Sequence, residues 1–184
     1  NDRGYITNSS FERISTRLNV SHQVKPWLSG NVNLGYTNST TNSNGQSSDS
    51  GSVFWFVDNL PSIYPLFQRD AAGAIIQDPI YGGGLYDYGE KRGFGGLTNA
   101  VSDAVRSLNR TKRNEVNLNA SLDFKIADYL HFETRFGAQY YNSAFTNREN
   151  PFYGPSASQN GSIFKQNTEL LNYNFQKLLR FNKI

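Results

Sequence analysis

The stretch that decides the fold is VNLNASLDFKI, residues 116–126, in which apolar and polar side chains alternate without interruption. Every second residue from Val116 to Ile126 is apolar, and the residues between them are polar or charged. Successive side chains of a β-strand point to opposite faces of the sheet. The stretch therefore predicts a strand with one apolar face and one polar face.

The same alternation recurs along the chain, interrupted by short breaks. One break is Lys25-Pro26, where proline cannot donate to a β-ladder, and another is Ala127-Asp128-Tyr129. Connections this short join antiparallel strands. The pattern blurs from Lys177 to Ile184. The predicted strands are residues 11–24, 28–38, 114–126, 130–145 and 168–180.

Two long segments, 39–113 and 146–167, lack the alternation and are rich in Gly, Ser, Asn, Asp and Tyr. Short turns at one end of the strands and long loops at the other are typical of outer-membrane barrels, whose long loops are extracellular. Within the first loop, apolar residues from Leu97 to Leu108 recur at helical spacing and predict a short amphipathic helix capped by Thr98 or Asn99. The apolar run 53–57 favours a second helix, ending near Pro61.

Composition excludes several classes of protein. A net charge of +3, with no basic run longer than Arg110 to Arg113, disfavours nucleic acid as a partner. The absence of cysteine excludes disulfides and thiol nucleophiles. No apolar run of about 18 residues is present, so we expect no transmembrane helix. The first residues show neither an initiator methionine nor a signal peptide, and we expect the chain to be an excerpt of a longer protein.

The polar faces of the predicted strands favour a membrane barrel over a soluble β-sandwich. Asn and Ser dominate these faces, whereas Lys and Glu are usual where a sheet meets bulk water. Strands of about 12 to 15 residues are long enough to cross a bilayer when tilted. Aromatic residues near the strand ends are typical of membrane-interface girdles; they are Trp27, Tyr36, Tyr129, Tyr140 and Tyr141. The predicted fold class is all-β, an antiparallel transmembrane β-barrel segment whose long extracellular loops carry short helices.

Three segments carry a resemblance to a known family: FERISTRLNV at residues 11–20, LPSIYPLFQRD at 60–70 and YDYG at 86–89. They resemble the SusC/RagA-type TonB-linked outer-membrane proteins of Bacteroidetes, in which a strand of this form precedes a hairpin and a long outer loop. The resemblance spans nearly the whole chain, and its segments occur in the same order.

The resemblance implies a barrel of about 22 strands plugged by an N-terminal domain. Such a protein imports glycan or peptide fragments across the cell outer membrane with energy relayed by TonB. Residues 1–184 would form part of one barrel domain, without the plug. The implied partners are outer-membrane lipid, a SusD-like lipoprotein, oligosaccharide or peptide cargo, and the TonB complex through parts outside this chain.

Two groups of residues are candidates for function. Polar strand residues either line a solute path or pair with the plug, and pairing is favoured because buried charges are seldom left unpaired; they are Arg13, Arg17, Asn31, Asn33, Glu133 and Arg135. Loop aromatics either stack on a ligand or form a small core that shapes the loop, and the core is favoured; they are Trp55, Tyr64, Tyr86 and Tyr88.

We expect no catalytic residue, metal site or cofactor. His22 and His131 are distant in sequence, and neither has the neighbouring ligand residues that a metal motif requires. Five loop carboxylates lack EF-hand spacing and are expected to be solvated; they are Asp58, Asp70, Asp78, Asp87 and Glu90. The alternatives to an importer are a soluble or surface-anchored β-rich carbohydrate-binding module, and a glycoside hydrolase, which requires two carboxylates across a cleft.

Overall fold

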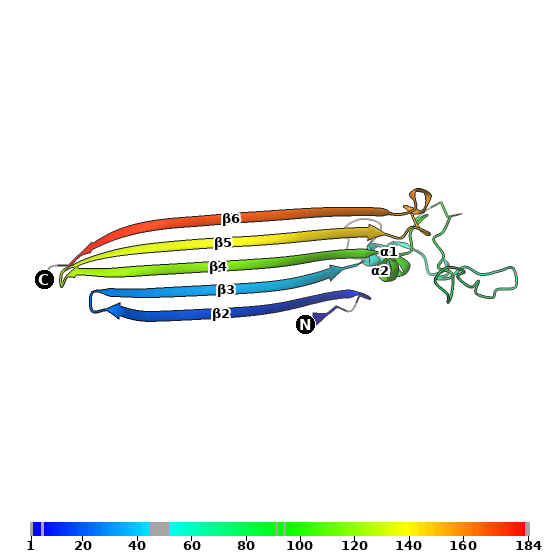
Figure 1. Ribbon diagram of the computed structural model, residues 1–184. Helices are drawn as coiled ribbons and strands as arrows, with labels where there is room; N and C mark the ends of the chain where they lie inside the picture. Colours follow the sequence, from blue (N-terminus) through cyan, green and yellow to red (C-terminus); the bar gives the residue numbers. More distant parts are fainter. Residues whose placement is uncertain (1, 5, 45–51, 91, 94, 183–184) are drawn as a thin grey trace. The chain divides into compact units, whose positions relative to one another are not determined.

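The computed structural model describes residues 2–4, 6–44, 52–90, 92–93 and 95–182. Six strands form one sheet in chain order, β1 to β6, as Figure 1 shows for the long ones. Sequential neighbours joined by tight turns are antiparallel, as the alternating arrows show. The strands are β1 (Asp2–Arg3), β2 (Ser9–Lys25), β3 (Leu28–Ser43), β4 (Leu108–Ala127), β5 (Leu130–Glu149) and β6 (Ser162–Phe181).

The short turns lie where the sequence predicts them. Pro26 and Trp27 join β2 to β3, and Asp128 and Tyr129 join β4 to β5. An ion pair of 2.6 Å between Nζ of Lys125 and Oδ1 of Asp128 spans the second turn. These turns confirm the two predicted hairpins.

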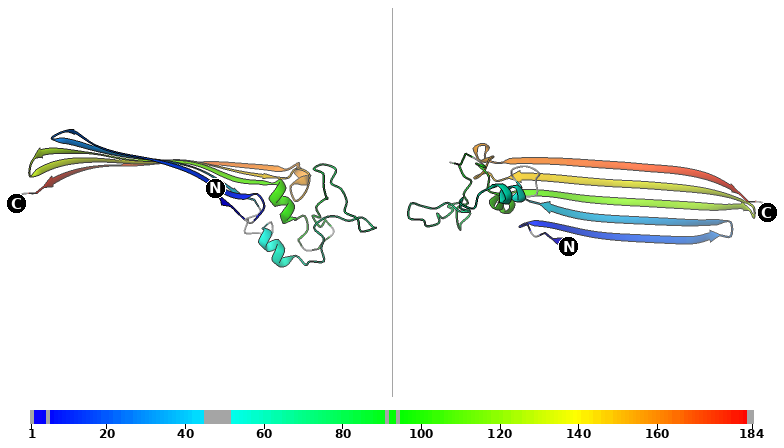
Figure 2. Two further views of the ribbon diagram at one scale, coloured as in Figure 1. Left: turned by 90° about the horizontal axis from the view of Figure 1, so that it is seen from below. Right: turned by 180° about the vertical axis from the view of Figure 1, so that it is seen from behind.

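Contacts group the chain into two compact units. The wall unit comprises residues 12–40, 112–144 and 166–184, and the loop unit comprises residues 1–11, 41–111 and 145–165. The strands of the wall unit twist about one another (Figure 2), as the right-handed twist of β-strands requires.

The strands are longer than predicted. β3 continues to Ser43, β4 already begins at Leu108, and β6 begins at Ser162, six residues before the predicted start at 168. The added end of β3 is polar, whereas that of β6 contains the consecutive apolar residues Ile163 and Phe164, and neither end shows apolar alternation. Side chains nevertheless join neighbouring strands near the ends of β3 and β4. Nδ2 of Asn42 donates to Oγ of Ser10 at 2.8 Å, and Nε of Arg110 donates to Oδ1 of Asn42 at 2.8 Å.

The apolar face of the wall unit is exposed. Along β6 the exposed fraction is 64% for Leu171, 74% for Tyr173 and 67% for Leu179, and Leu122 of β4 is 43% exposed. A soluble protein rarely exposes so large an apolar surface unless something covers it. The buried apolar residues of the described chain instead belong to the loop unit; they are Ile6, Tyr88, Ala100 and Ala104.

Both predicted helices are present. α1 (Val53–Asn59) begins after Ser52, whose hydroxyl accepts from the backbone N–H of Trp55. α2 (Ala100–Arg106) is capped by Asn99, whose side chain accepts from the N–H of Ser102 at 3.0 Å. α2 ends before Leu108, which instead begins β4. Neither α1 nor α2, nor any other described helix, is long and apolar enough to cross a membrane.

The loop unit also contains a small folded segment that the sequence did not predict. Three antiparallel bridges join Phe67 to Tyr86, Arg69 to Ile75 and Gln77 to Gly84. A Cβ at Gly84 would lie 2.8 Å from Cδ1 of Phe67, so only glycine allows this close approach. A 3-10 turn, η1 (Ala157–Gln159), lies in the second long segment.

Candidate functional site

Charged side chains of three strands form a five-residue group on the polar face of the wall unit, which we call the turn-side cluster. Nδ1 of His131 lies 2.8 Å from Oδ1 of Asp123. Arg135 donates from Nε and Nη2 to Glu133 at 2.6 and 3.1 Å. Arg180 contacts Asp123, and its Nη2 lies 3.3 Å from Oε2 of Glu133. Two arginines thus balance two carboxylates.

A second group on the polar face, the loop-side cluster, surrounds Glu115. Its carboxylate accepts from Arg113, Asn117 and Gln139, each at 3.0 Å. The guanidinium of Arg113 lies 4.1 Å from the ring centroid of Tyr141. The members of this cluster all lie on β4 and β5, so the alternation of two neighbouring strands is enough to bring them together.

The six strand residues singled out from the sequence all lie on this polar face. They line two shallow hollows, one of about 280 Å³ and one of about 410 Å³. Arg13, Arg17 and Asn33 line the smaller hollow. Asn31, Asn33, Glu133 and Arg135 line the larger one. The alternation predicted that these six residues share one face, and they do. Their role in a solute path or in contact with the plug stays a prediction.

Sequence reasoning did not single out the other cluster members, among them Glu115, Asp123 and Arg180. Glu115 and Asp123 occupy the polar positions of the 114–126 alternation, and that parity could have found them. Arg180 lies where the alternation of β6 blurs, so no sequence signal placed it beside Asp123.

In the loop unit, Asp78 and Arg106 form a buried ion pair. Oδ2 of Asp78 lies 2.7 Å from Nη2 of Arg106, in ionic contact without hydrogen-bond alignment, and their side chains are 0% and 8% exposed. Oδ1 of Asp78 accepts from the N–H groups of Ile80 and Tyr81 and from the hydroxyl of Tyr153. Burial by itself raises the pKa of Asp78, but these donors outweigh burial and lower that pKa to about 2.

Three tyrosine rings surround the guanidinium of Arg106. It lies 4.2 Å from the ring centroid of Tyr81, 5.0 Å from that of Tyr86 and 5.5 Å from that of Tyr153. Burial and the nearby Asp78 raise the pKa of Tyr153 to about 12, so its hydroxyl stays protonated and donates to Asp78. Ring faces attract cations, and Arg106 is therefore held by several partners at once.

A second buried polar group lies beside α2. The hydroxyl of Tyr88 is 2.7 Å from Oγ of Ser102 and 3.2 Å from Oδ1 of Asp103. Burial raises the pKa of Asp103 to about 6, although the Tyr88 hydroxyl opposes that shift and Glu149 adds to it. Burial and Asp103 together raise the pKa of Tyr88. Asp103 is thus poised to change its charge in a mildly acidic medium.

The four loop aromatics singled out from the sequence take different positions. Tyr88 is 4% exposed and belongs to the core of the loop unit, the role that the sequence favoured for this group. Tyr86 lines a cavity. Tyr64 is 36% exposed and lies beneath the guanidinium of Arg92, 5.3 Å from its ring centroid. Trp55 lies on α1.

Three of the loop carboxylates shape their own turns. Asp70 accepts from the N–H groups of Ala72 and Ala74, and Asp87 accepts from the N–H of Gly89. Asp78 likewise accepts from the N–H groups of Ile80 and Tyr81. Across the residues that the structure describes, no three His, Asp or Glu side chains gather as metal ligands would.

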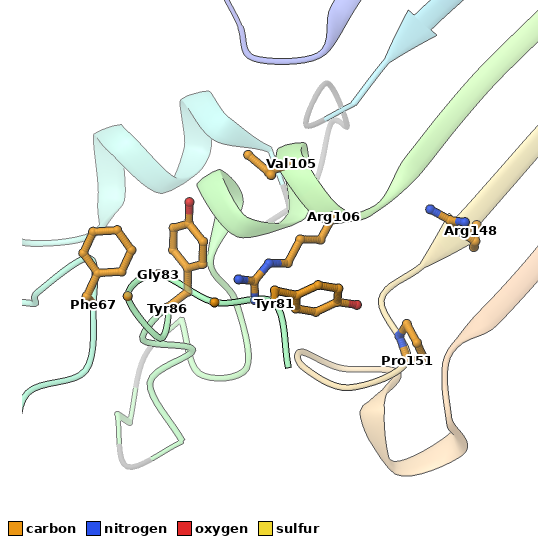
Figure 3. Close-up of a pocket in the computed structure, with 10 residues that line it drawn as sticks. Phe67, Tyr81, Gly83, Tyr86, Val105, Arg106, Arg148 and Pro151 are labelled. Atoms are coloured by element: carbon orange, nitrogen blue, oxygen red, sulfur yellow. The ribbon is translucent and has the colours of Figure 1, made fainter. Parts of the chain in front are cut away.

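The cavity in the loop unit has a volume of about 710 Å³ (Figure 3). Phe67 and Tyr86 stand at one side of it, with ring centroids 4.8 Å apart, and Arg148 and Pro151 stand at the other. Arg106 of α2 reaches between them beside Tyr81, as Figure 3 shows. The cavity therefore combines flat apolar surfaces with two guanidinium groups.

The fold of the chain has a counterpart among solved structures. The chain is similar to one in the RagAB peptide importer in its closed-closed state. The TM-score is 0.65 and the sequence identity 20%, and the match covers 94% of this chain. It covers 18% of the solved chain, so this chain spans less than a fifth of that length. No protein-family model matches the sequence, and no curated protein matches it.

At this level of identity the likeness concerns the fold. It agrees with the six-stranded sheet in chain order and confirms the predicted class, an all-β antiparallel sheet of barrel-wall type with short helices in the connecting loops. The SusC/RagA-like architecture implied by the sequence resemblance is supported at the level of fold.

Proposed function

We propose that the chain forms part of the wall and outer vestibule of a TonB-dependent importer in the cell outer membrane. The observation that carries this proposal is the opposition of the two faces of the wall unit. One face exposes large apolar side chains, and the other holds charges whose partners lie within the same face. In a membrane barrel, lipid covers the apolar face, and the water of the lumen hydrates the charged face.

The cargo in this proposal is a peptide or glycan fragment. The fold likeness to a peptide importer supports a peptide, and the SusC resemblance supports a glycan. A SusD-like lipoprotein covers the outer face, and the TonB complex acts through parts outside this chain. A wall segment needs no reaction chemistry, and the proposal assigns it none.

Spin labels test the membrane location. The chain has no native cysteine, so one introduced cysteine gives one labelled position. Labels at Leu122 and Leu171 are expected to be relaxed more by lipid-soluble oxygen than by a water-soluble nickel chelate. Labels at Asn119 and Asn172, on the polar face, serve as matched controls and are expected to show the reverse.

The outcome also separates the alternatives. If the apolar-face labels are reached mainly by the nickel chelate after reconstitution of the full-length protein in lipid vesicles, the chain does not line a membrane. A soluble or surface-anchored carbohydrate-binding module would then be the better explanation of its β-rich fold.

A further inference from the structure

The cavity of the loop unit contains a buried donor that lacks an acceptor. Nη1 of Arg106 is buried and has no hydrogen-bond partner within the described part of the chain, and Arg106 lines the cavity. Leaving such a donor unsatisfied is unfavourable, so native proteins rarely tolerate it without a reason. Because Nη1 itself is shielded from solvent, an acceptor in the cavity reaches it only when the rings packed on the guanidinium move apart.

The lining of the cavity also carries an excess of positive charge. Asp78 balances Arg106, but Arg148 of β5 lines the same cavity and is exposed, with no ion pair to any described carboxylate. Its neighbour Glu149 is engaged with the hydroxyl of Ser156. Because no Asp or Glu of the described residues lines the cavity, an anion entering it meets an attractive field.

The remaining surface suits a flat or apolar body. The rings of Phe67, Tyr81 and Tyr86 provide stacking faces, and the run Gly82 to Gly84 contributes no side chains that would fill the space. A Cβ at Gly82 or Gly83 would meet no atom within 4 Å, and both have φ above +70°. A volume of about 710 Å³ holds a small ligand.

We propose that this cavity binds a carboxylate carried on a small apolar or ring-shaped body. Arg148 holds the carboxylate, Arg106 completes its hydrogen bonding, and Tyr81 and Tyr86 stack on the attached body. A guanidinium is the donor best matched to a carboxylate, because its N–H groups form a planar fork. This inference rests on the proposed function and narrows its cargo to acidic fragments.

Two sources supply this chemistry in an importer of fragments, the C-terminus of a peptide and a uronic-acid sugar. The probes are a tripeptide ending in phenylalanine, with a free or an amidated C-terminus, and trigalacturonate beside neutral trigalactose. Calorimetric titration of the full-length protein in detergent micelles measures each affinity. We expect at least one acidic probe to bind about tenfold more tightly than its neutral counterpart.

Substitutions test which residue causes the preference for the acidic probe. Arg148→Gln is expected to weaken binding of the acidic probe about tenfold, while the affinity for its neutral counterpart changes less than about twofold. Arg69→Gln is the matched control, because Arg69 is exposed in the same unit and its side chain donates to the carbonyl of Gly73 outside the cavity. Its affinities are expected to equal those of the unaltered protein.

Equal binding of acidic and neutral probes would overturn the inference, as would no binding of any probe. An equal loss for both probes in Arg148→Gln would do the same. The spin-label experiment tests the proposed importer separately from this binding site. If the apolar face proves to be in water while the preference for carboxylate persists, the importer is rejected and the binding site stands.

Discussion

The wall unit and the loop unit both contain arginine–carboxylate pairs, but in opposite settings. In the wall unit, Nε of Arg135 lies 2.6 Å from Glu133; the arginine side chain is 51% exposed and that of Glu133 is 10% exposed. In the loop unit, Nη2 of Arg106 lies 2.7 Å from Asp78, and the two side chains are 8% and 0% exposed. Similar distances therefore correspond to very different surroundings.

This contrast indicates which interactions stabilise each unit. An open pair is weakened by water, so the wall unit depends on backbone ladders and on what covers its apolar face. A buried pair is strongly destabilising when one partner is lost, because the other charge remains in the interior. The loop unit has few buried apolar residues and depends on such polar contacts.

The largest expected effect comes from breaking the buried pair. Asp78→Asn should destabilise the loop unit by about 3–5 kcal/mol, because Arg106 loses its counter-charge. Hydrogen exchange of peptides covering residues 78–106 in the full-length protein measures this loss. Asp128→Asn is the control, since Asp128 pairs with Lys125 at a side-chain exposure of 93%. Equal effects of the two substitutions would contradict the contrast between the units.

The next effect concerns the two faces of the wall unit. Leu171→Arg should cost about 2–4 kcal/mol in lipid vesicles, because β6 would then carry a charge into the apolar layer. Asn172→Arg, one residue away on the polar face, should change the free energy of unfolding by less than about 1 kcal/mol. Denaturant titration of the reconstituted protein compares the two. Similar costs would show that both faces have the same surroundings.

A pH titration should then separate the loop unit from the wall unit. The folded pKa of Asp103 is raised to about 6 from 3.8, so the folded state binds the proton more tightly. Its contribution to stability is lost as pH rises from about 4 to about 6, on the order of 3 kcal/mol. For Asp78, whose folded pKa is lowered, stability is lost as pH falls through about 2.

Hydrogen exchange of α2, corrected for the intrinsic pH dependence of exchange, follows this titration. The loop unit should be most protected near about pH 4, and Asp103→Asn should flatten the decline above that value. A decline that persists in Asp103→Asn would assign the effect to another group.

The smallest effect is expected in the turn-side cluster. Glu133→Gln should cost about 1 kcal/mol or less, because Arg135 and Arg180 stay in contact with solvent. Arg180 also keeps its contact with Asp123. Denaturant titration measures the change, and a loss as large as that of Asp78→Asn would show that this face is closed to water.

The sequence predicted the wall unit well because its physical cause is local. Alternation in the 114–126 stretch gave that strand and its two faces, and alternation in the 130–145 stretch placed Glu133 and Arg135 on the polar face. The strand ends were harder. At Ser43 the residues are polar on both faces, and cross-strand hydrogen bonds rather than alternation continue the ladder. After Ser162 two consecutive apolar residues, Ile163 and Phe164, interrupt the alternation.

The cavity could not be predicted from the sequence. Asp78 and Arg106 lie in different parts of a long loop, and no periodicity relates them. Arg148 joins them from a strand that the prediction ended at residue 145. The loop aromatics were correctly seen as candidates for a core or for ligand contact, but only a folded structure separates Tyr88 from Tyr86.

The unbroken alternation of β4 also limits which insertions within the strand preserve its two faces. One codon inserted after Leu118 would send every later side chain to the opposite face, placing Asp123 among the apolar residues and Phe124 among the polar ones. An insertion of two codons would leave both faces intact. Strands of this wall are therefore free to lengthen or shorten only in steps of two residues, whereas the long loops have no such rule.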